Sequence, residues 1–176
     1  MANKATQAGF YELKSMKIRP ISSKEEGIEI SQIITSWNIG ESMFASNITG
    51  SVNVIDAEGI QRILPILGEE ILSIQWVDFY GDIQKKEFYC YGLRDLGPLQ
   101  DSSESLMNYR LDFTSIEHLT AAQGEVRQSF ANQLISDMVQ SVYDTYFKTT
   151  SKTIEIEPTV GNQTFALPTM TPASAM

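Results

Sequence analysis

The clearest order of apolar and polar positions lies between Ile48 and Tyr80. Strand-like alternation opens this stretch, with Ile48, Val52 and Val54 on one side and Thr49, Ser51 and Asn53 on the other. Asp56 ends the alternation and is placed to cap a short helix over residues 57–64, which Pro65 terminates. After Gly68, the run ILSIQWVDFY is apolar at nearly every position, as is typical of a strand covered on both faces. The stretch predicts a strand, a short helix and a buried strand as one unit.

Further strands are predicted on both sides of this unit. Residues 28–38 would form a strand that pairs with residues 48–54 across a long connection. Residues 83–93 would return after a turn at Tyr80-Gly81-Asp82. Residues 105–116 alternate most cleanly, with Met107, Tyr109, Leu111 and Phe113 opposite Asn108, Arg110, Asp112 and Thr114. Weaker patterns predict a first strand over residues 10–19 and an edge strand over residues 152–157.

Residues 125–147 are predicted to form one long amphipathic helix. Their apolar positions recur every four residues, at Val126, Phe130, Leu134, Met138, Val142 and Tyr146. Because an isolated helix of this length would be marginal, we expect it to pack against the sheet through Phe130, Leu134 and Met138. Packing against a partner helix is the alternative.

These elements predict a mainly β (α+β) fold, a β-sandwich or partly closed barrel of about six to seven strands with one short and one long helix. Residues 1–27 are expected to be an N-terminal arm and residues 28–157 the β domain, including the helix over residues 125–147. Residues 158–176, rich in Pro, Thr and Ala, are expected to be a tail or the start of a further domain.

Charge changes the picture at one end of the chain. The first 27 residues carry a net charge of +2 and the remainder −11, which together give −9. The acidic body argues against a nucleic-acid-binding surface, which depends on clustered Lys and Arg. The basic arm is expected to dock on an acidic neighbour, or else to be a dispensable tail. No apolar run approaches the ~20 residues of a membrane span, so no membrane insertion is expected.

The sequence holds no recognisable catalytic or metal-ligand motif. His118 is the single histidine, and a surface or helix-start position is a better interpretation for it than a general base. Cys90, the single cysteine, lies in an aromatic strand and is expected to be a buried, inert thiol. We therefore expect no enzyme activity, no metal and no cofactor. A small enzyme that uses His118 stays open as an alternative.

The order of elements in SVNVIDAEGIQRILPILGEEILSIQW resembles the first tube-like domain of phage baseplate hub proteins. These proteins lie at the tip of the tail tube in contractile-tailed phages and are related to the base of type VI secretion spikes. The resemblance extends over about residues 28–147. It implies a tail-tube-like fold and a structural role in the virion, at the tail baseplate, after assembly in the host cytoplasm.

The resemblance also implies a homo-oligomeric ring that connects the tail tube to the central spike and encloses the DNA channel. The implied partners are the tail tube protein, the central spike and the tape-measure protein, with no individual residue assigned to any of them. Hub proteins of this family present two tube-like domains per chain, whereas this sequence has clear material for one. A trimer and a hexamer therefore both stay open.

The polar side of the paired strands 28–38 and 48–54 is a candidate channel wall. It consists of Glu29, Ser31, Thr35, Thr49, Ser51 and Asn53, and contains no Lys or Arg. A wall without cations gives DNA phosphates no counterion-release gain, so that DNA would pass without specific binding. An ordinary solvent-facing sheet would show the same pattern.

A monomeric β-sandwich adaptor that binds a partner through an exposed strand edge is the alternative to the ring protein.

Overall fold

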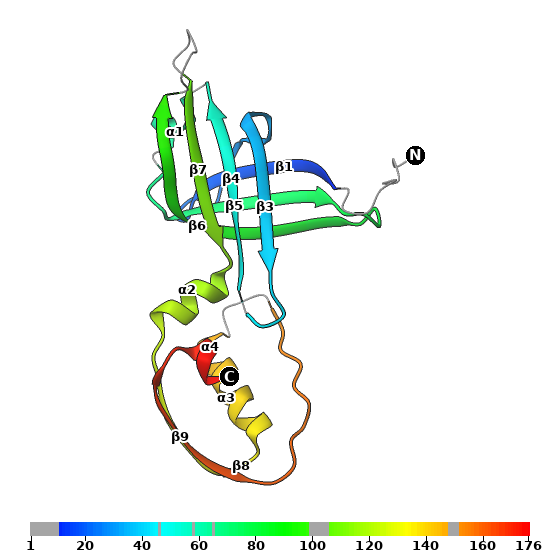
Figure 1. The fold of residues 1–176 in the computed structure, drawn as a ribbon, viewed down its shortest axis with the longest axis vertical. Helices are drawn as coiled ribbons and strands as arrows, with labels where there is room; N and C mark the ends of the chain where they lie inside the picture. The colour runs from blue at the N-terminus through cyan, green and yellow to red at the C-terminus, as the bar shows by residue number, and fades with distance from the viewer. Residues whose placement is uncertain (1–10, 46, 58, 65, 99–105, 148–151) are drawn as a thin grey trace. The chain divides into compact units, whose positions relative to one another are not determined.

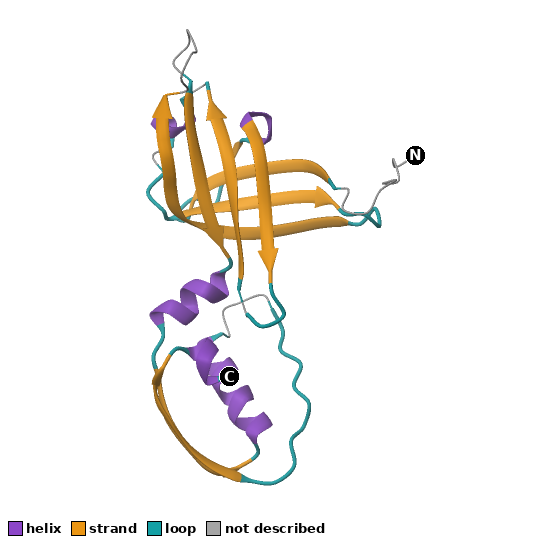
Figure 2. Cartoon of the chain, viewed as in Figure 1, coloured by secondary structure: helices purple, strands orange, loops and turns teal. Residues whose placement is uncertain are grey.

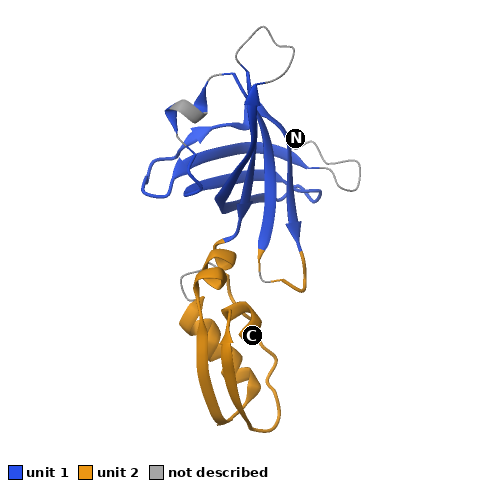
Figure 3. Cartoon of the chain, turned by 60° about the vertical axis from the view of Figure 1, so that its left-hand side comes forward, with its two compact units in different colours: residues 1–41, 48–115 blue, residues 42–47, 116–176 orange. Residues whose placement is uncertain are grey.

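A computed structural model describes residues 11–45, 47–57, 59–64, 66–98, 106–147 and 152–176 (Figure 1). The chain divides into two compact units (Figure 3). Unit 1 consists of residues 1–41 and 48–115, and unit 2 of residues 42–47 and 116–176.

Unit 1 is built on one antiparallel sheet of seven strands (Figure 2). Its strands are β1 (Glu12–Pro20), β2 (Ile28–Glu29), β3 (Ile34–Glu41), β4 (Ile48–Asp56), β5 (Glu70–Val77), β6 (Ile83–Pro98) and β7 (Met107–Thr114). Their order across the sheet is β2-β1-β5-β6-β7-β4-β3. The 16-residue strand β6 joins two halves, because its first part pairs with β5 and its second part with β7.

The two halves of the sheet fold over each other and enclose the core of unit 1. In Figure 1, β1, β5 and the start of β6 run across the direction of β3, β4 and β7. Trp37 of β3 and Trp76 of β5, which are not neighbours in the sheet, meet with ring centroids 5.8 Å apart. Phe88 and Phe113 pack in the same core at 4.8 Å. The predicted mainly β sandwich is confirmed, and the sheet does not close into a barrel.

The predicted order of strand, short helix and buried strand over residues 48–80 is present as β4, α1 (Ile60–Ile63) and β5. The helix is shorter than predicted. Gly59 precedes it in a left-handed conformation, and Asp56 Oδ1 accepts a hydrogen bond from the Gly59 N–H (2.8 Å). Asp56 thus stabilises the turn before the helix rather than acting as its N-cap.

The predicted continuous strand over residues 28–38 is wrong. Its first residues form β2, which pairs with β1, and a 3-10 turn over Ser31–Ile33 separates them from β3, which pairs with β4. Ile30 is buried at this break, and Ile33 packs partly against the core. Burial of these two side chains through a tight turn explains the irregular alternation at Gln32 and Ile33 in the sequence.

Unit 2 is a small α/β arrangement with its own apolar core. Its elements are α2 (Ile116–Gln123), β8 (Val126–Gln133), α3 (Ile135–Tyr146), β9 (Gln163–Met170) and α4 (Pro172–Ala175). Strands β8 and β9 form an antiparallel pair, against which α3 packs. Val126, Phe130, Met138 and Val142 make the buried cluster.

The predicted helix over residues 125–147 is wrong in its first half, which is strand β8. A spacing of four residues fits the face of a helix, but it also equals two repeats of a strand, whose faces alternate every two residues. Val126 and Phe130 are buried on one strand face, and Met138 and Val142 on one helix face, which produces an unbroken four-residue pattern across both. Asn132, with φ of 53°, lies near the change of structure.

The units also divide the chain differently from the predicted domains. Residues 12–20 of the expected arm form β1, whose Met16 and Ile18 are fully buried; residues 1–10 lie outside the described part. In the expected tail, residues 163–170 form β9, whereas residues 152–157 are not a strand. Pro168 fits β9 because this strand pairs on one side only within the described chain.

Candidate interaction surfaces

The outward face of β3, β4, β7 and the second part of β6 carries two polar rows that run across the strands. The cross-strand register gives the first row as Ser36, Asn53, Arg110 and Arg94, and the second as Asn38, Ser51, Asp112 and Gly92. Asn53 Nδ2 donates to Ser36 Oγ and Asn38 Nδ2 to Ser51 Oγ, each at 2.8 Å. Each of these hydrogen bonds joins a side chain of β3 to a side chain of β4 within one row.

Asp112 is the charged centre of this face. Its side chain is only 4% exposed, and Arg94 Nε lies 2.6 Å from Oδ2 while Arg110 Nε lies 2.8 Å from Oδ1. The two arginines face each other on β6 and β7 and are 65% and 46% exposed. The alternation of residues 107–114 already places Arg110 and Asp112 on one face. Nothing in the pattern of residues indicates that Arg94 joins them, because its position depends on the bulged pairing of β6 with β7.

The six predicted channel-lining residues do not form one surface. Glu29 and Ser31 lie beside β1 instead of on β3 and β4. Ser51 is 2% exposed, so it is not the exposed wall residue that we expected. Thr35, Thr49 and Asn53 stay at least partly exposed on β3 and β4. The expected lack of cations applies to these two strands only, because Asn53 pairs directly with Arg110 of β7.

Glu29 protects the outer edge of β1. Its carboxylate accepts hydrogen bonds from the Ser15 hydroxyl (2.6 Å), the Met16 N–H (2.8 Å) and the Ser31 hydroxyl. Burial on its own raises the pKa of Glu29, but these hydrogen bonds outweigh it and hold the pKa below its usual value. These side chains thus satisfy the Met16 N–H, a backbone donor that β1 would otherwise expose at this edge.

The opposite edge, β3, has no such cover. Within the described chain, β3 pairs with β4 alone, and its sequence ITSWNIGE contains no Lys, Arg or Pro and a single charged residue, Glu41, at its last position. Charged side chains and proline are the usual means by which proteins block pairing at an edge. Gly40 leaves space near the end of β3, where an added Cβ would meet nothing closer than 3.6 Å. This eight-residue edge is therefore open to another strand.

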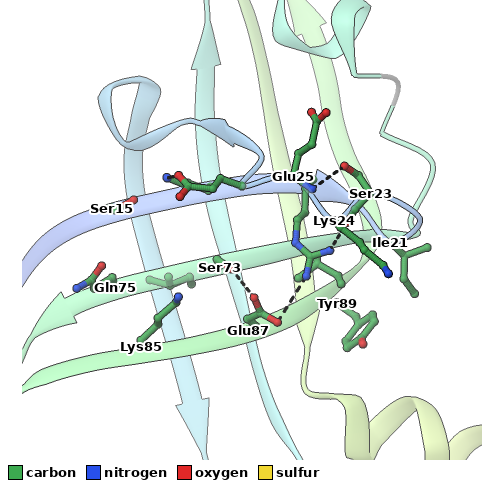
Figure 4. Close-up of a pocket in the computed structure, with 15 residues that line it drawn as sticks. Ser15, Ile21, Ser23, Lys24, Glu25, Ser73, Gln75, Lys85, Glu87 and Tyr89 are labelled. Atoms are coloured by element: carbon green, nitrogen blue, oxygen red, sulfur yellow. Dashed lines mark hydrogen bonds and ion pairs between the residues drawn. The ribbon is translucent and has the colours of Figure 1, made fainter.

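A second surface is a groove of about 750 Å³ on the outer side of β1, β5 and the first part of β6 (Figure 4). Residues 21–26 lie along one part of it, held by Lys17 Nζ to Glu26 Oε2 (2.6 Å) and by Arg19 Nη1, which donates to the Ser23 carbonyl oxygen (2.7 Å). Arg19 also lies 3.7 Å from Glu87, which accepts a hydrogen bond from Ser73. Most of the charges in the groove therefore neutralise one another, and they favour no class of ligand.

Unit 2 has an apolar hollow of about 150 Å³ between α3, the β8–β9 pair and α4. Its lining includes Phe130 and Met138, two of the predicted core residues, which are 4% and 5% exposed. Leu134, the third, is half-buried at the start of α3. Ile135 and Phe165 also line the hollow, and their side chains remain exposed.

The single cysteine is buried, and the single histidine is exposed. Cys90 is buried, and burial together with the negative charge of Glu70 raises the pKa of its thiol to about 12. His118 is exposed, and its Nδ1 lies 3.2 Å from Asn47 Nδ2 within unit 2. Among the described residues, no group of His, Cys, Asp and Glu could hold a metal ion. No helix in this part of the chain has the length and apolar character needed to cross a membrane.

No protein-family profile and no curated protein matches the chain. Three solved structures of the Francisella PdpA–VgrG complex are distantly similar to it: the half-lidded form (12% identity, TM-score 0.47), the lidded form (12%, 0.46) and the lidless form (13%, 0.44). The matches cover 76%, 79% and 75% of this chain, but only 22%, 20% and 24% of the chains matched. At this identity and TM-score, the likeness carries no conclusion about what this chain binds or does.

Proposed function

We propose that this chain is a structural component of a contractile tail tip, a baseplate hub protein whose copies join into a ring. The ring would connect the tail tube to the central spike and enclose the DNA channel. The support comes from the sequence resemblance over residues 28–147. The strand–helix–strand unit whose residues carry this resemblance is present as β4, α1 and β5.

One observation carries the assembly part of the proposal: the two edges of the seven-stranded sheet differ. The β1 edge is covered by β2 and by the Glu29 carboxylate, whereas the β3 edge is long and unprotected in the described chain. An unprotected edge is suited to pairing with a strand of another subunit. We therefore assign β3 as the edge through which copies meet.

The experiment is to measure the mass of the purified full chain by light scattering and to image the particles by negative-stain electron microscopy. The proposal expects a closed ring of three or six copies. A monomer at every concentration up to the highest soluble one, with no ring in the images, would remove it.

The same open edge favours one second function, a monomeric β-sandwich adaptor that pairs β3 with an extended segment of another protein. The two functions differ in mass, because the adaptor stays monomeric until its partner is added. Both are roles without catalysis. If His118→Ala abolished the biological function in a folded protein, the assignment of a non-enzymatic role would have to be withdrawn.

The proposal also includes a channel wall, made of three of the six residues predicted from the sequence. Thr35, Thr49 and Asn53 are the members of the predicted set that lie on β3 and β4 with some exposure, and we propose that these line the bore. Cysteines placed at Thr35 and Thr49 in a Cys90→Ala background would then react only with reagents small enough to enter the ring. Equal labelling by small and large reagents would place these side chains on the outside.

A further inference from the structure

We infer that Arg94 and Arg110 form a recognition site for a carboxylate group of an acidic segment in a protein partner. The site lies on the outward face of β6 and β7, apart from the β3 edge assigned to assembly but on the same face as Asn53, which pairs with Arg110 and which we propose to line the bore. It goes beyond the proposed function, because it is built within one chain and does not depend on ring formation.

The first step of the argument is the number of cations. Asp112 is almost fully buried, and a buried carboxylate needs a charged partner. One arginine would satisfy that need. The chain places two there, directly opposite each other on neighbouring strands, where like charges repel. The cluster therefore keeps one positive charge more than its own structure requires.

The second step is the orientation of the two guanidinium groups. Each directs its Nε toward a different oxygen of Asp112. Within the described residues, Asp112 is the only acceptor that either group contacts, so that the Nη groups remain as donors on exposed side chains. Arginines held in place lose less conformational entropy on binding, and their planar donor pairs match the two oxygens of a carboxylate.

The third step is the class of ligand. Nucleic-acid binding requires many cations that follow the phosphate backbone. This face offers two arginines, and the negative charge of Asp112 cancels one of their two positive charges. The chain as a whole has a net charge of −9. The other members of the two rows are neutral: Ser36, Asn38, Ser51, Asn53 and Gly92. Two arginines on an otherwise neutral polar surface therefore suit the carboxylates of an acidic protein segment better than the long row of phosphates in a nucleic acid.

The test is fluorescence anisotropy of a labelled octaglutamate peptide with the full chain at 0.15 M salt, beside an octaglutamine peptide and a single-stranded DNA oligonucleotide. Arg94→Gln is the main variant, because Arg110 still pairs with Asp112 when Arg94 loses its charge. Arg94→Lys keeps the charge but not the planar fork. Arg127→Gln, at a 70%-exposed arginine of unit 2, is the matched control for a lost surface charge.

We expect the wild type and Arg127→Gln to bind octaglutamate and not octaglutamine. Arg94→Gln should weaken binding about tenfold, as for the loss of one charge-assisted pair, and Arg94→Lys should also weaken it severalfold. No octaglutamate binding by the wild type, an unchanged affinity in Arg94→Gln, or full affinity in Arg94→Lys would overturn the inference. Preferential binding of the DNA would overturn the ligand class. Light scattering of the wild type and Arg94→Gln should give the same mass, so that a loss of peptide binding without a loss of assembly separates this inference from the ring.

Discussion

Phe113 on β7 occupies the space that a side chain on its cross-strand partner Gly50 would need. A Cβ at position 50 would stand 2.3 Å from the Phe113 Cζ atom and 2.3 Å from the backbone oxygen of Asn38. Phe113 itself is fully buried and packs on Phe88. A glycine on β4, the neighbour of the edge strand β3, thus allows the large aromatic ring to enter the core between the two halves of the sheet.

Gly50→Ala should therefore destabilise unit 1. Neither a buried ring nor a strand backbone can move away at low cost, so we expect a loss of about 1–3 kcal/mol in the free energy of unfolding, the usual range for overpacking. Urea denaturation followed by tryptophan fluorescence measures it. Gly92→Ala is the control, since its Cβ would meet only Asp112, at an ordinary 3.8 Å. Similar losses in the two variants would show that the position of Phe113 is wrong.

The core of unit 2 makes a second prediction. Phe130→Ala and Met138→Ala remove buried side chains on β8 and α3, and each should cost about 2–5 kcal/mol. Amide hydrogen exchange of α3 reads the stability of this unit on its own. Gln133→Ala, at an exposed site on β8, should leave the exchange rates unchanged. Protection equal to the wild type in Phe130→Ala would contradict the strand–helix core.

Cys90 predicts a specific response to alkaline pH. The folded state raises the pKa of this thiol to about 12, whereas an unfolded chain ionises it near its ordinary value. At pH between these two values the unfolded state binds fewer protons, so the stability falls as the pH rises through about 9 to 12. Cys90→Ala should show a shallower fall over this window. In the native wild type, a thiol reagent at pH 8 should react only at the rate of unfolding; rapid labelling would contradict the burial.

Glu29 predicts that stability falls as the pH falls, the reverse of the dependence expected from Cys90. Hydrogen bonds from Ser15, Met16 and Ser31 hold its pKa below the ordinary value, so its contribution is complete above that value and is lost as the pH falls through the lowered pKa. Glu29→Gln should therefore be less stable than the wild type at pH 7, and the difference should narrow toward pH 3. A constant difference across this range, measured by urea denaturation, would mean that the carboxylate charge is not what matters at this edge.

The sequence allowed the central part of the fold to be predicted because its patterns are local. Alternation over β4 and β7 identified both strands and their faces, and the punctuation at Asp56, Pro65 and Gly68 located the short helix between two strands. Three parts could not be predicted. The spacing of Val126 and Phe130 fits strand and helix alike, and Pro168 in QTFALPTM concealed β9. The break between Glu29 and Ile34 depends on which strands pair, which is a tertiary property.

The candidate surfaces were predictable to a lesser degree. The polar character of Thr49 and Asn53 was readable from alternation, but the burial of Ser51 results from its neighbours on β3 and β7. The cluster at Asp112 joins residues of β6 and β7 through a pairing with two register shifts. Alternation alone does not indicate such shifts, which is why the arginine pair appears only in the structure.

The central claim is that copies of this chain meet through the β3 edge, and Gly40 offers the most direct test of it. The site has room for a side chain and an ordinary backbone conformation, so that Gly40→Ala and Gly40→Lys should both fold. A lysine on an edge strand opposes pairing with another strand, whereas an alanine does not.

The deciding measurement is the mass of the wild type, Gly40→Ala and Gly40→Lys by light scattering at one protein concentration, with circular dichroism as the check on folding. We predict ring-sized particles for the wild type and Gly40→Ala, and a folded monomer for Gly40→Lys. Rings of unchanged mass and stability in Gly40→Lys would contradict assembly through β3.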